Sequence, residues 1–163
     1  MRVAVISDTH MPKGRRRLPA ACLDRLRAAD LILHAGDLAS VAFLEELRRL
    51  GPPVECVVGN VDEPALHRLL PLEAVVEAGG ARIGMVHVAG ARAGREARLT
   101  ARFPGCDAVV YGHSHEPQVE RVGEVWILNP GSPTERRRAP ARTMLELCVR
   151  DGRVAPELVD LGT

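Results

Sequence analysis

Several short apolar runs in this chain end abruptly in polar residues, and this pattern constrains the fold more than any other feature. The runs are rich in β-branched residues, which is typical of strands covered on both faces. They are RVAVIS at residues 2–7, LILH at 31–34, VECVVG at 54–59, IGMV at 83–86 and DAVVYG at 107–112. Ligands of open α/β sheets bind outside the carboxyl ends of strands. We therefore expect the polar residues that follow these runs to converge on one rim.

The rest of the pattern predicts an α/β fold in a single domain spanning residues 1–163. The first half alternates strands with helices, which are expected at residues 19–29, 40–50 and 62–70. The second half reads as three hairpins with glycine-containing turns, together with one more helix at residues 92–102. We expect two packed mixed β-sheets flanked by α-helices.

Composition disfavours several classes of protein. Aromatic residues make up 2% of the chain, which makes a nucleic-acid polymer an unlikely partner because single-strand binders stack bases on aromatic rings. No apolar run approaches the ~20 residues of a membrane helix, and the first residues lack the long apolar core of a signal peptide. We expect a cytoplasmic location without membrane contact. The four cysteines are interpreted as buried free thiols, with two disulfides as the alternative: Cys22, Cys56, Cys106 and Cys148.

Two arginine clusters, at residues 15–17 and 136–138, stand out against a net charge of +1. Such clusters are most often solvated loops. The alternative is that they line the rim and attract phosphate, because each follows a loop with candidate functional residues.

The residues after the apolar runs share a ligand chemistry of carboxylate, amide and imidazole groups without thiolate. This mixture suits borderline divalent ions such as Mn²⁺, Fe²⁺, Zn²⁺, Ni²⁺ or Co²⁺. There are more such side chains than one tetrahedral ion takes, and two ions that share a carboxylate would use all of them. The candidate metal ligands are Asp8, His10, Asp37, Asn60, His87, His113 and His115.

The motifs that carry these ligands resemble those of the calcineurin-like metallophosphoesterases, and of their small single-domain phosphodiesterases in particular. The matching elements in order are DTH, GD, GNVD, a lone His after a strand, GHSH and NPGSP, which extend from residue 8 to residue 133. The resemblance implies a four-layer αββα sandwich. It also implies one metal held by Asp8, His10, Asp37 and His115, and a second held by Asp37, Asn60, His87 and His113, with Asp37 as the bridge.

The resemblance implies a phosphodiesterase that hydrolyses small phosphodiesters with a hydroxide activated by two metal ions. Mn²⁺ is the favoured ion, with Fe, Zn, Ni, Co or Mg as alternatives. Asn60 and Asp62 are the candidate catalytic residues. The rival hypothesis is a metal-binding scaffold with little or no turnover, since the family also resembles a retromer subunit. A nuclease of the same superfamily fits the few aromatic residues poorly, and a homodimer or homotetramer is compatible with a small enzyme of this kind.

Two positions depart from the family pattern. Val61 stands where many relatives have a histidine that protonates the leaving oxygen or binds phosphate, and His87 is followed by Val88 instead of glycine. Losing a general acid costs roughly 10²–10⁴-fold in rate. We therefore expect a preference for phosphodiesters or activated aryl esters, whose leaving groups need less help from a proton donor.

Several residues near these motifs have two interpretations. Asp62 is either a residue that orients a water or ligand or the N-cap of the helix that follows it. The segment Asn129-Pro130-Gly131-Ser132 is interpreted as a turn that ends a strand, with a loop that holds a ligand-bearing segment as the alternative. His34 is interpreted as a hydrogen-bonded core residue, with contact to the metal ligands as the alternative. His67 is expected on the surface.

Overall fold

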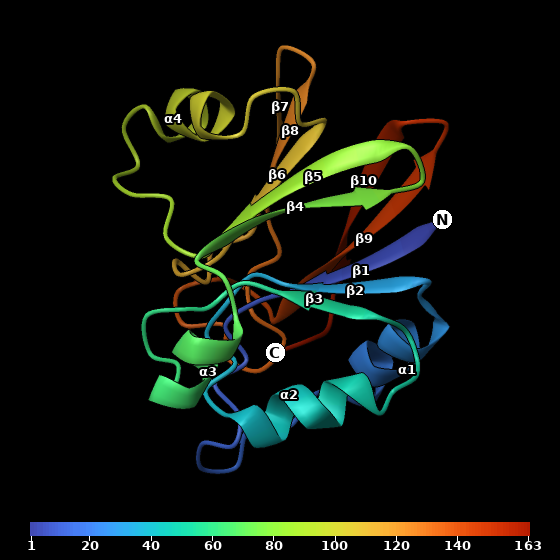
Figure 1. Cartoon of the computed structure of the whole chain (residues 1–163). Helices are drawn as coiled ribbons and strands as arrows, with labels where there is room; N and C mark the ends of the chain where they lie inside the picture. Colours follow the sequence, from blue (N-terminus) through green and yellow to red (C-terminus); the bar gives the residue numbers. More distant parts are fainter.

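The computed structural model describes all 163 residues and contains two five-stranded sheets packed face to face (Figure 1). In the first sheet, with strand order β10-β9-β1-β2-β3, β1, β2 and β3 are parallel and β9 and β10 form an antiparallel hairpin. Its strands are β1 (Arg2–Ile6), β2 (Leu31–His34), β3 (Val54–Cys56), β9 (Thr143–Arg150) and β10 (Arg153–Asp160).

The second sheet has the order β4-β5-β6-β8-β7, in which β5, β6 and β8 are parallel and the two outer strands are antiparallel to their neighbours. Its strands are β4 (Glu73–Ala78), β5 (Ala81–Val86), β6 (Ala108–Tyr111), β7 (Gln118–Val122) and β8 (Val125–Asn129). The predicted α/β class with two mixed sheets and flanking helices is thus confirmed. The VECVVG strand is shorter than predicted, since β3 ends at Cys56.

Side chains of the central strands alternate between two apolar layers, as period-two strand geometry requires. Val3 and Val5 of β1 point into the core between the sheets, whereas Ala4 and Ile6 face the helices. Both layers are nearly free of solvent exposure, which explains why these strands read as continuous apolar runs.

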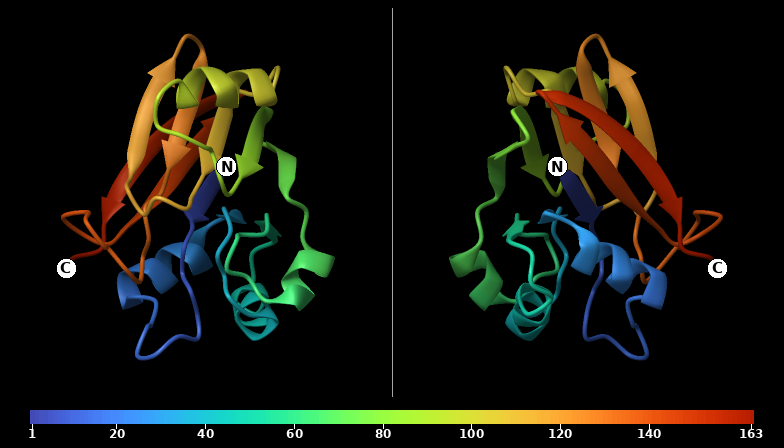
Figure 2. Two further views of the ribbon diagram at one scale, coloured as in Figure 1. Left: turned by 90° about the vertical axis from the view of Figure 1, so that its left-hand side faces the viewer. Right: turned by 90° about the vertical axis from the view of Figure 1, so that its right-hand side faces the viewer.

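Four helices complete the layers, as the side views show (Figure 2). The first sheet is covered on its outer face by α1 (Ala20–Ala28), α2 (Val41–Arg48) and α3 (Pro64–Leu69), and the second by α4 (Arg95–Arg102). Ser40 caps α2 by accepting a hydrogen bond from the Phe43 amide at 3.2 Å. No helix in the structure combines the length and the apolar character needed to cross a membrane.

The helices start and end within three residues of the predicted positions, and the starts of α4 and α3 differ from the prediction for a structural reason. Helix α4 starts at Arg95, three residues after the predicted start, because Gly94 precedes it in the left-handed region with φ of 68°. Helix α3 has Glu63 at its N-cap position without a side-chain capping bond, so the interpretation of Asp62 as a helix cap is wrong.

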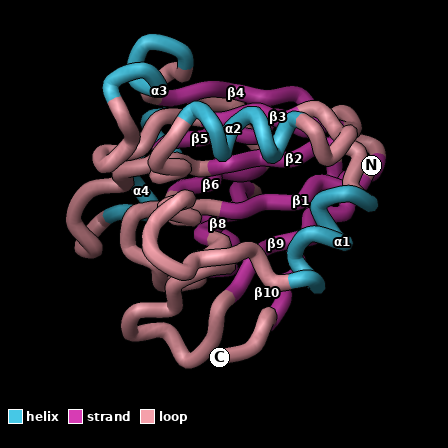
Figure 3. The backbone as a smooth tube through the Cα atoms, turned by 90° about the horizontal axis from the view of Figure 1, so that it is seen from below, coloured by secondary structure: helices cyan, strands magenta, loops and turns pink.

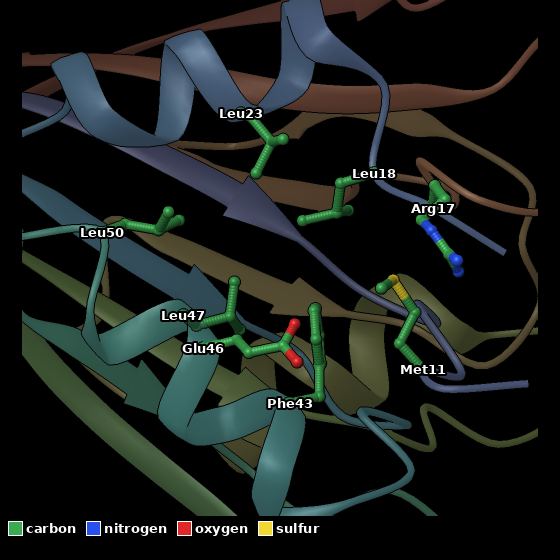
Figure 4. A pocket seen from close by; sticks show the side chains of 8 residues that line it. All are labelled: Met11, Arg17, Leu18, Leu23, Phe43, Glu46, Leu47 and Leu50. Carbon is green, nitrogen blue, oxygen red and sulfur yellow. The ribbon is translucent and has the colours of Figure 1, made fainter.

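Helices α1 and α2 leave an apolar cavity of about 190 Å³ between them (Figure 4). Leu23 of α1 and Phe43 and Leu47 of α2 line it, and Met11 and Arg17 lie at one end. The guanidinium group of Arg17 points away from the leucine side chains.

The loops that follow β1, β2, β3, β5 and β6 gather at the end of the molecule opposite the N-terminus (Figures 1 and 3). Ile6 pairs with His34 across the β1–β2 ladder, and Val86 pairs with Tyr111 across β5–β6, so each pair of parallel strands ends at one level. The predicted convergence of polar residues on one rim follows from this arrangement.

The cysteines are free thiols, and the prediction that all are buried is wrong for Cys148, which is exposed on β9. Burial raises the pKa of Cys22 to about 12 and that of Cys56 to about 12, so these thiols stay protonated and unreactive.

We therefore expect one of the four thiols to react with an aromatic disulfide reagent in the folded protein, and all four after unfolding in guanidinium chloride. Spectrophotometric thiol counting at pH 8 measures this. Cys148→Ser should abolish labelling of the folded protein. Equally fast labelling of a second thiol would contradict the burial of the other three.

Candidate metal centre

The predicted ligands meet at the loop-rich end of the sheets in two neighbouring clusters. Within each cluster the ligand atoms lie within 4.8 Å of one another. The first cluster contains Asp8, His10 and His115, and the second contains Asp37, His87 and His113. The two histidines of the GHSH motif thus belong to different clusters.

Asp37 lies between the two clusters. Its Oδ2 atom is 3.2 Å from Nε2 of His87 in one cluster and 3.8 Å from Nε2 of His10 in the other. The carboxylate is therefore placed to be shared. Asn60 belongs to the second cluster, because its Oδ1 lies 3.0 Å from Nε2 of His87 and 2.9 Å from Nδ1 of His113.

The backbone at these positions adopts a conformation that residues other than glycine rarely take. Eight non-glycine residues have positive φ. Five are candidate ligands with φ between 47° and 70°: Asp8, His10, Asp37, His113 and His115. Left-handed residues cost free energy and cluster at functional sites. Here they turn each side chain back toward the common centre directly after its strand.

Two glycines of the motifs allow the loops to approach this closely. A Cβ atom on Gly59 would overlap the backbone nitrogen of Asp37. A Cβ atom on Gly112 would lie 2.8 Å from Oδ2 of Asp8 and would overlap the Ser7 hydroxyl. The glycines of the GN and GH motifs are thus required by contact between loops.

Hydrogen bonds to the far side of the rings orient two of the imidazoles. Nδ1 of His87 lies 2.7 Å from the Ala35 carbonyl, and Nδ1 of His115 lies 3.1 Å from the Glu135 carbonyl. Since a carbonyl only accepts, each Nδ1 donates, and each Nε2 presents its lone pair to the centre. Such backbone partners are typical of metal-bound histidines.

Burial disfavours charge on the ionisable groups of the centre, and a bound cation would balance the charge of the buried carboxylates. Burial raises the pKa of Asp8 to about 7, and burial lowers the pKa of His115 to about 4. Burial also acts to raise the pKa of Asp37, but the His87 hydrogen bond and charge outweigh it and lower that pKa. Two inward-facing carboxylates, an amide oxygen and oriented imidazole nitrogens fit divalent cations, with each cluster offering ligands for one ion.

Ser132 and Asn129 hold the ligand-bearing loops in place, so the interpretation of this segment as a simple turn is insufficient. The Ser132 hydroxyl donates to the Asp8 carbonyl at 2.8 Å. The Asn129 amide donates to the Gly112 carbonyl at 3.1 Å and the Ser114 hydroxyl at 3.1 Å. The order of the motifs indicated that this segment matters, but the apolar pattern did not reveal which backbone and side-chain atoms its residues bind.

The two remaining histidines lie as expected. His34 is fully buried, and its ring is satisfied by the Thr9 hydroxyl at 3.0 Å and the Gly36 amide at 3.2 Å. It is a hydrogen-bonded core residue that supports two ligand-bearing loops. His67 is exposed on α3.

Asp62 binds backbone rather than solvent. Its Oδ1 accepts the Ala39 amide at 2.7 Å, and its Oδ2 accepts the Gly59 amide at 2.7 Å. The carboxylate thus links the loop after β2 to the loop after β3, which carry Asp37 and Asn60. The structure supports a positioning role for Asp62.

Comparison with known proteins identifies the family. The family model described as "Calcineurin-like phosphoesterase superfamily domain" matches residues 1–152 of this chain. This chain belongs to the calcineurin-like phosphoesterase superfamily. A probable metallophosphoesterase of Methanothermobacter thermautotrophicus is 38% identical to this chain, and the match covers 89% of this chain and 84% of the relative.

Two further relatives extend the comparison. A phosphodiesterase of Methanocaldococcus jannaschii is 24% identical over 80% of this chain and 83% of the relative. Wild-type Vps29 from Entamoeba histolytica, whose structure is a complex with Zn²⁺, superimposes with a TM-score of 0.77 at 28% identity, covering 99% of this chain and 100% of that one. The predicted superfamily and its small Vps29-like fold are confirmed.

Replacing Asp62 tests its positioning role in this phosphoesterase. In Asp62→Asn one carboxylate oxygen becomes an NH₂ group, which cannot accept the amide that now faces it. A lost buried bond to a charged group costs about 1.5–3 kcal/mol, and we expect the free energy of unfolding to fall by about that amount. Urea denaturation in excess chelator measures it without any contribution from metal. Asp151→Asn, in an exposed hairpin turn, is the matched control, and an equal effect of the two substitutions would contradict the positioning role.

Proposed function

We propose that this protein is a metal-dependent phosphodiesterase that hydrolyses small phosphodiesters, with Mn²⁺ as the favoured ion. The observation that carries the proposal is the complete set of seven ligand side chains, gathered in two clusters around Asp37. Two divalent cations held there would generate a nucleophile from water at neutral pH and neutralise charge on the phosphoryl group. The M. jannaschii relative, named a phosphodiesterase, supports the choice of reaction.

The protein's own residues hold the centre in a shape that needs little rearrangement. Asp8 accepts the Ser7 hydroxyl at 2.7 Å through Oδ2 and the His113 amide through both oxygens, at 3.0 Å for Oδ2 and 3.2 Å for Oδ1. Its Oδ1 also lies 3.4 Å from Nε2 of His115. His113 is the exposed member of its cluster, whereas Asp37 and His87 are buried. The open side of the centre, where substrate would enter, therefore lies at His113.

At position 61 the chain has a valine and therefore lacks a proton donor for the leaving oxygen. The Val61 amide donates to Oδ1 of Asp37 at 3.0 Å, so this residue lies directly beside the proposed bridging carboxylate. Its side chain is 51% exposed and offers no proton to a departing oxygen. This supports a preference for phosphodiesters with good leaving groups over alkyl phosphomonoesters.

A scaffold without turnover is the second candidate, and one observation favours it. Three of the eight exposed large apolar residues lie in the segment between β3 and β4, where Val61 is 51%, Leu69 60% and Leu72 71% exposed. A contiguous apolar surface there would suit a protein contact. Turnover distinguishes the two candidates, because a scaffold does not require an intact ligand set.

We expect Mn²⁺-dependent hydrolysis of bis(p-nitrophenyl) phosphate, abolished by chelator. Asp37→Ala removes the shared ligand and should lower kcat/KM by at least about 10²-fold, since metal-ion charge stabilisation contributes several kcal/mol. Metal analysis should find two ions per chain in the wild type and fewer in the variant. Asp24→Ala, which removes an exposed carboxylate on α1, is the control. Absence of turnover with both sites loaded would favour the scaffold.

Restoring a proton donor tests the role assigned to position 61. Val61→His should raise kcat/KM for an alkyl phosphomonoester by roughly 10²-fold, the lower range for a general acid. The gain on bis(p-nitrophenyl) phosphate should be much smaller, because nitrophenolate leaves without protonation. Val61→Ala controls for the change in size, and an unchanged rate for Val61→His on the alkyl ester would refute the argument.

A further inference from the structure

The segments that carry the two arginine clusters meet near the candidate centre, where Glu135 pairs with Arg16 of the first cluster and with Arg137 of the second. The loop after β1 and the loop before β9 together line one open pocket of about 480 Å³ without any hydrophobic residue. We call this the basic pocket; it is lined by Lys13, Gly14, Arg15, Arg16, Arg17, Thr134 and Arg142.

The two segments that contribute to the basic pocket concentrate positive charge that the rest of the chain does not share, and five of their cations line the pocket. Residues 13–17 and 134–142 hold eight of the 22 Lys and Arg residues and one of the 21 Asp and Glu residues. The remainder of the chain therefore carries six more acidic than basic groups. The single acidic residue, Glu135, pairs with Arg16 at 2.8 Å and Arg137 at 3.8 Å. The other six cations of the two segments form no ion pair with an acidic side chain, and one of them, Arg142, donates to the carbonyl oxygens of Gly162 at 3.4 Å and Thr163 at 2.6 Å.

One buried donor in the pocket has no partner. Arg16 uses Nη2 for its ion pair with Glu135, whereas its Nη1 atom is buried and makes no hydrogen bond. A buried guanidinium nitrogen without an acceptor is costly. Arg16 lines the basic pocket, and an anion there would supply the acceptor once the guanidinium turned this nitrogen toward the opening.

The basic pocket and the metal centre share a wall. Thr134 lines the pocket, and its hydroxyl donates to the Thr9 carbonyl at 2.9 Å, between two candidate ligands. Glu135 accepts His115 Nδ1 through its carbonyl at 3.1 Å and Arg16 through its carboxylate at 2.8 Å. A single residue therefore separates a metal-facing imidazole from the basic pocket.

We propose that the basic pocket binds a second phosphate group of the substrate, carried on one ester arm of a phosphodiester whose scissile group lies at the metal centre. The inference rests on the proposed function and deepens it, since it names bisphosphorylated phosphodiesters as the substrate class. Arginine and lysine bind phosphate through charge-assisted hydrogen bonds, and two anionic groups on one small molecule match two adjacent cationic sites. A polynucleotide fits less well, because no aromatic side chain lines the pocket for base stacking.

A pair of chromogenic substrates tests the proposal. The p-nitrophenyl ester of thymidine 5′-phosphate and the same ester with an added 3′-phosphate release the same leaving group and differ in one phosphate. We expect the KM of the 3′-phosphorylated ester to be about tenfold lower, because its additional phosphate forms charge-assisted hydrogen bonds with the basic pocket. Lys13→Gln/Arg15→Gln should bring the two KM values together. Arg49→Gln/Arg153→Gln removes two charges outside the pocket and should preserve the tenfold preference.

A binding measurement separates this proposal from the proposed function. Calorimetry on the Mn²⁺-loaded protein should show thymidine 3′,5′-bisphosphate binding about tenfold more tightly than thymidine 5′-phosphate, and the Lys13→Gln/Arg15→Gln variant should lose the difference. If neither ester is hydrolysed, the proposed function fails while the calorimetric difference still supports a second phosphate site.

Two results would overturn the proposal. One is equal affinity of the wild type for the two nucleotides. The other is an oligothymidylate that binds more tightly than the bisphosphate with a steep dependence on salt, which would assign the basic pocket to polyanions.

Discussion

Asp37 connects the two clusters of the candidate centre. Its backbone carbonyl accepts the His10 amide at 3.0 Å, its Oδ1 accepts the Val61 amide at 3.0 Å, and its Oδ2 faces His87 at 3.2 Å. One residue thus links the loops that follow β1, β3 and β5 to its own loop after β2. Because these loops come from both sheets, the separation of the sheets and the geometry of the centre depend on each other.

This arrangement requires unfavourable backbone conformations at several candidate ligands, and other interactions must compensate for their cost. Each left-handed residue costs of order 1 kcal/mol or more, and five candidate ligands adopt that conformation. The compensation is local: Asp62 binds two loop amides, Ser132 binds the Asp8 carbonyl, and Gly59 and Gly112 let the loops touch. The loops are therefore fixed before any ligand arrives, which lowers the cost of reaching a productive geometry.

The sequence predicted the strands well because each buried strand is an uninterrupted apolar run bounded by a turn or a polar cluster. The convergence of the candidate ligands was predictable for the same reason, since parallel strands end at one level. The direction of each side chain was not, because positive φ at residues such as His113 and His115 leaves no apolar pattern. Nor could apolar pattern show that Asp62 accepts loop amides, or that Cys148 on β9 is exposed.

The charge of the ligand set gives a separate argument about the substrate. Asp8 and Asp37 are the only carboxylates in the two clusters, and the other ligands are neutral as donors. Two divalent cations would leave an excess of two positive charges. A phosphodiester with one negative charge and an attacking hydroxide with another balance that excess, whereas a phosphomonoester dianion overshoots it. The preference proposed from Val61 would therefore have a second, electrostatic cause. A further phosphate on the substrate would require cations outside the ligand set, such as those of the basic pocket.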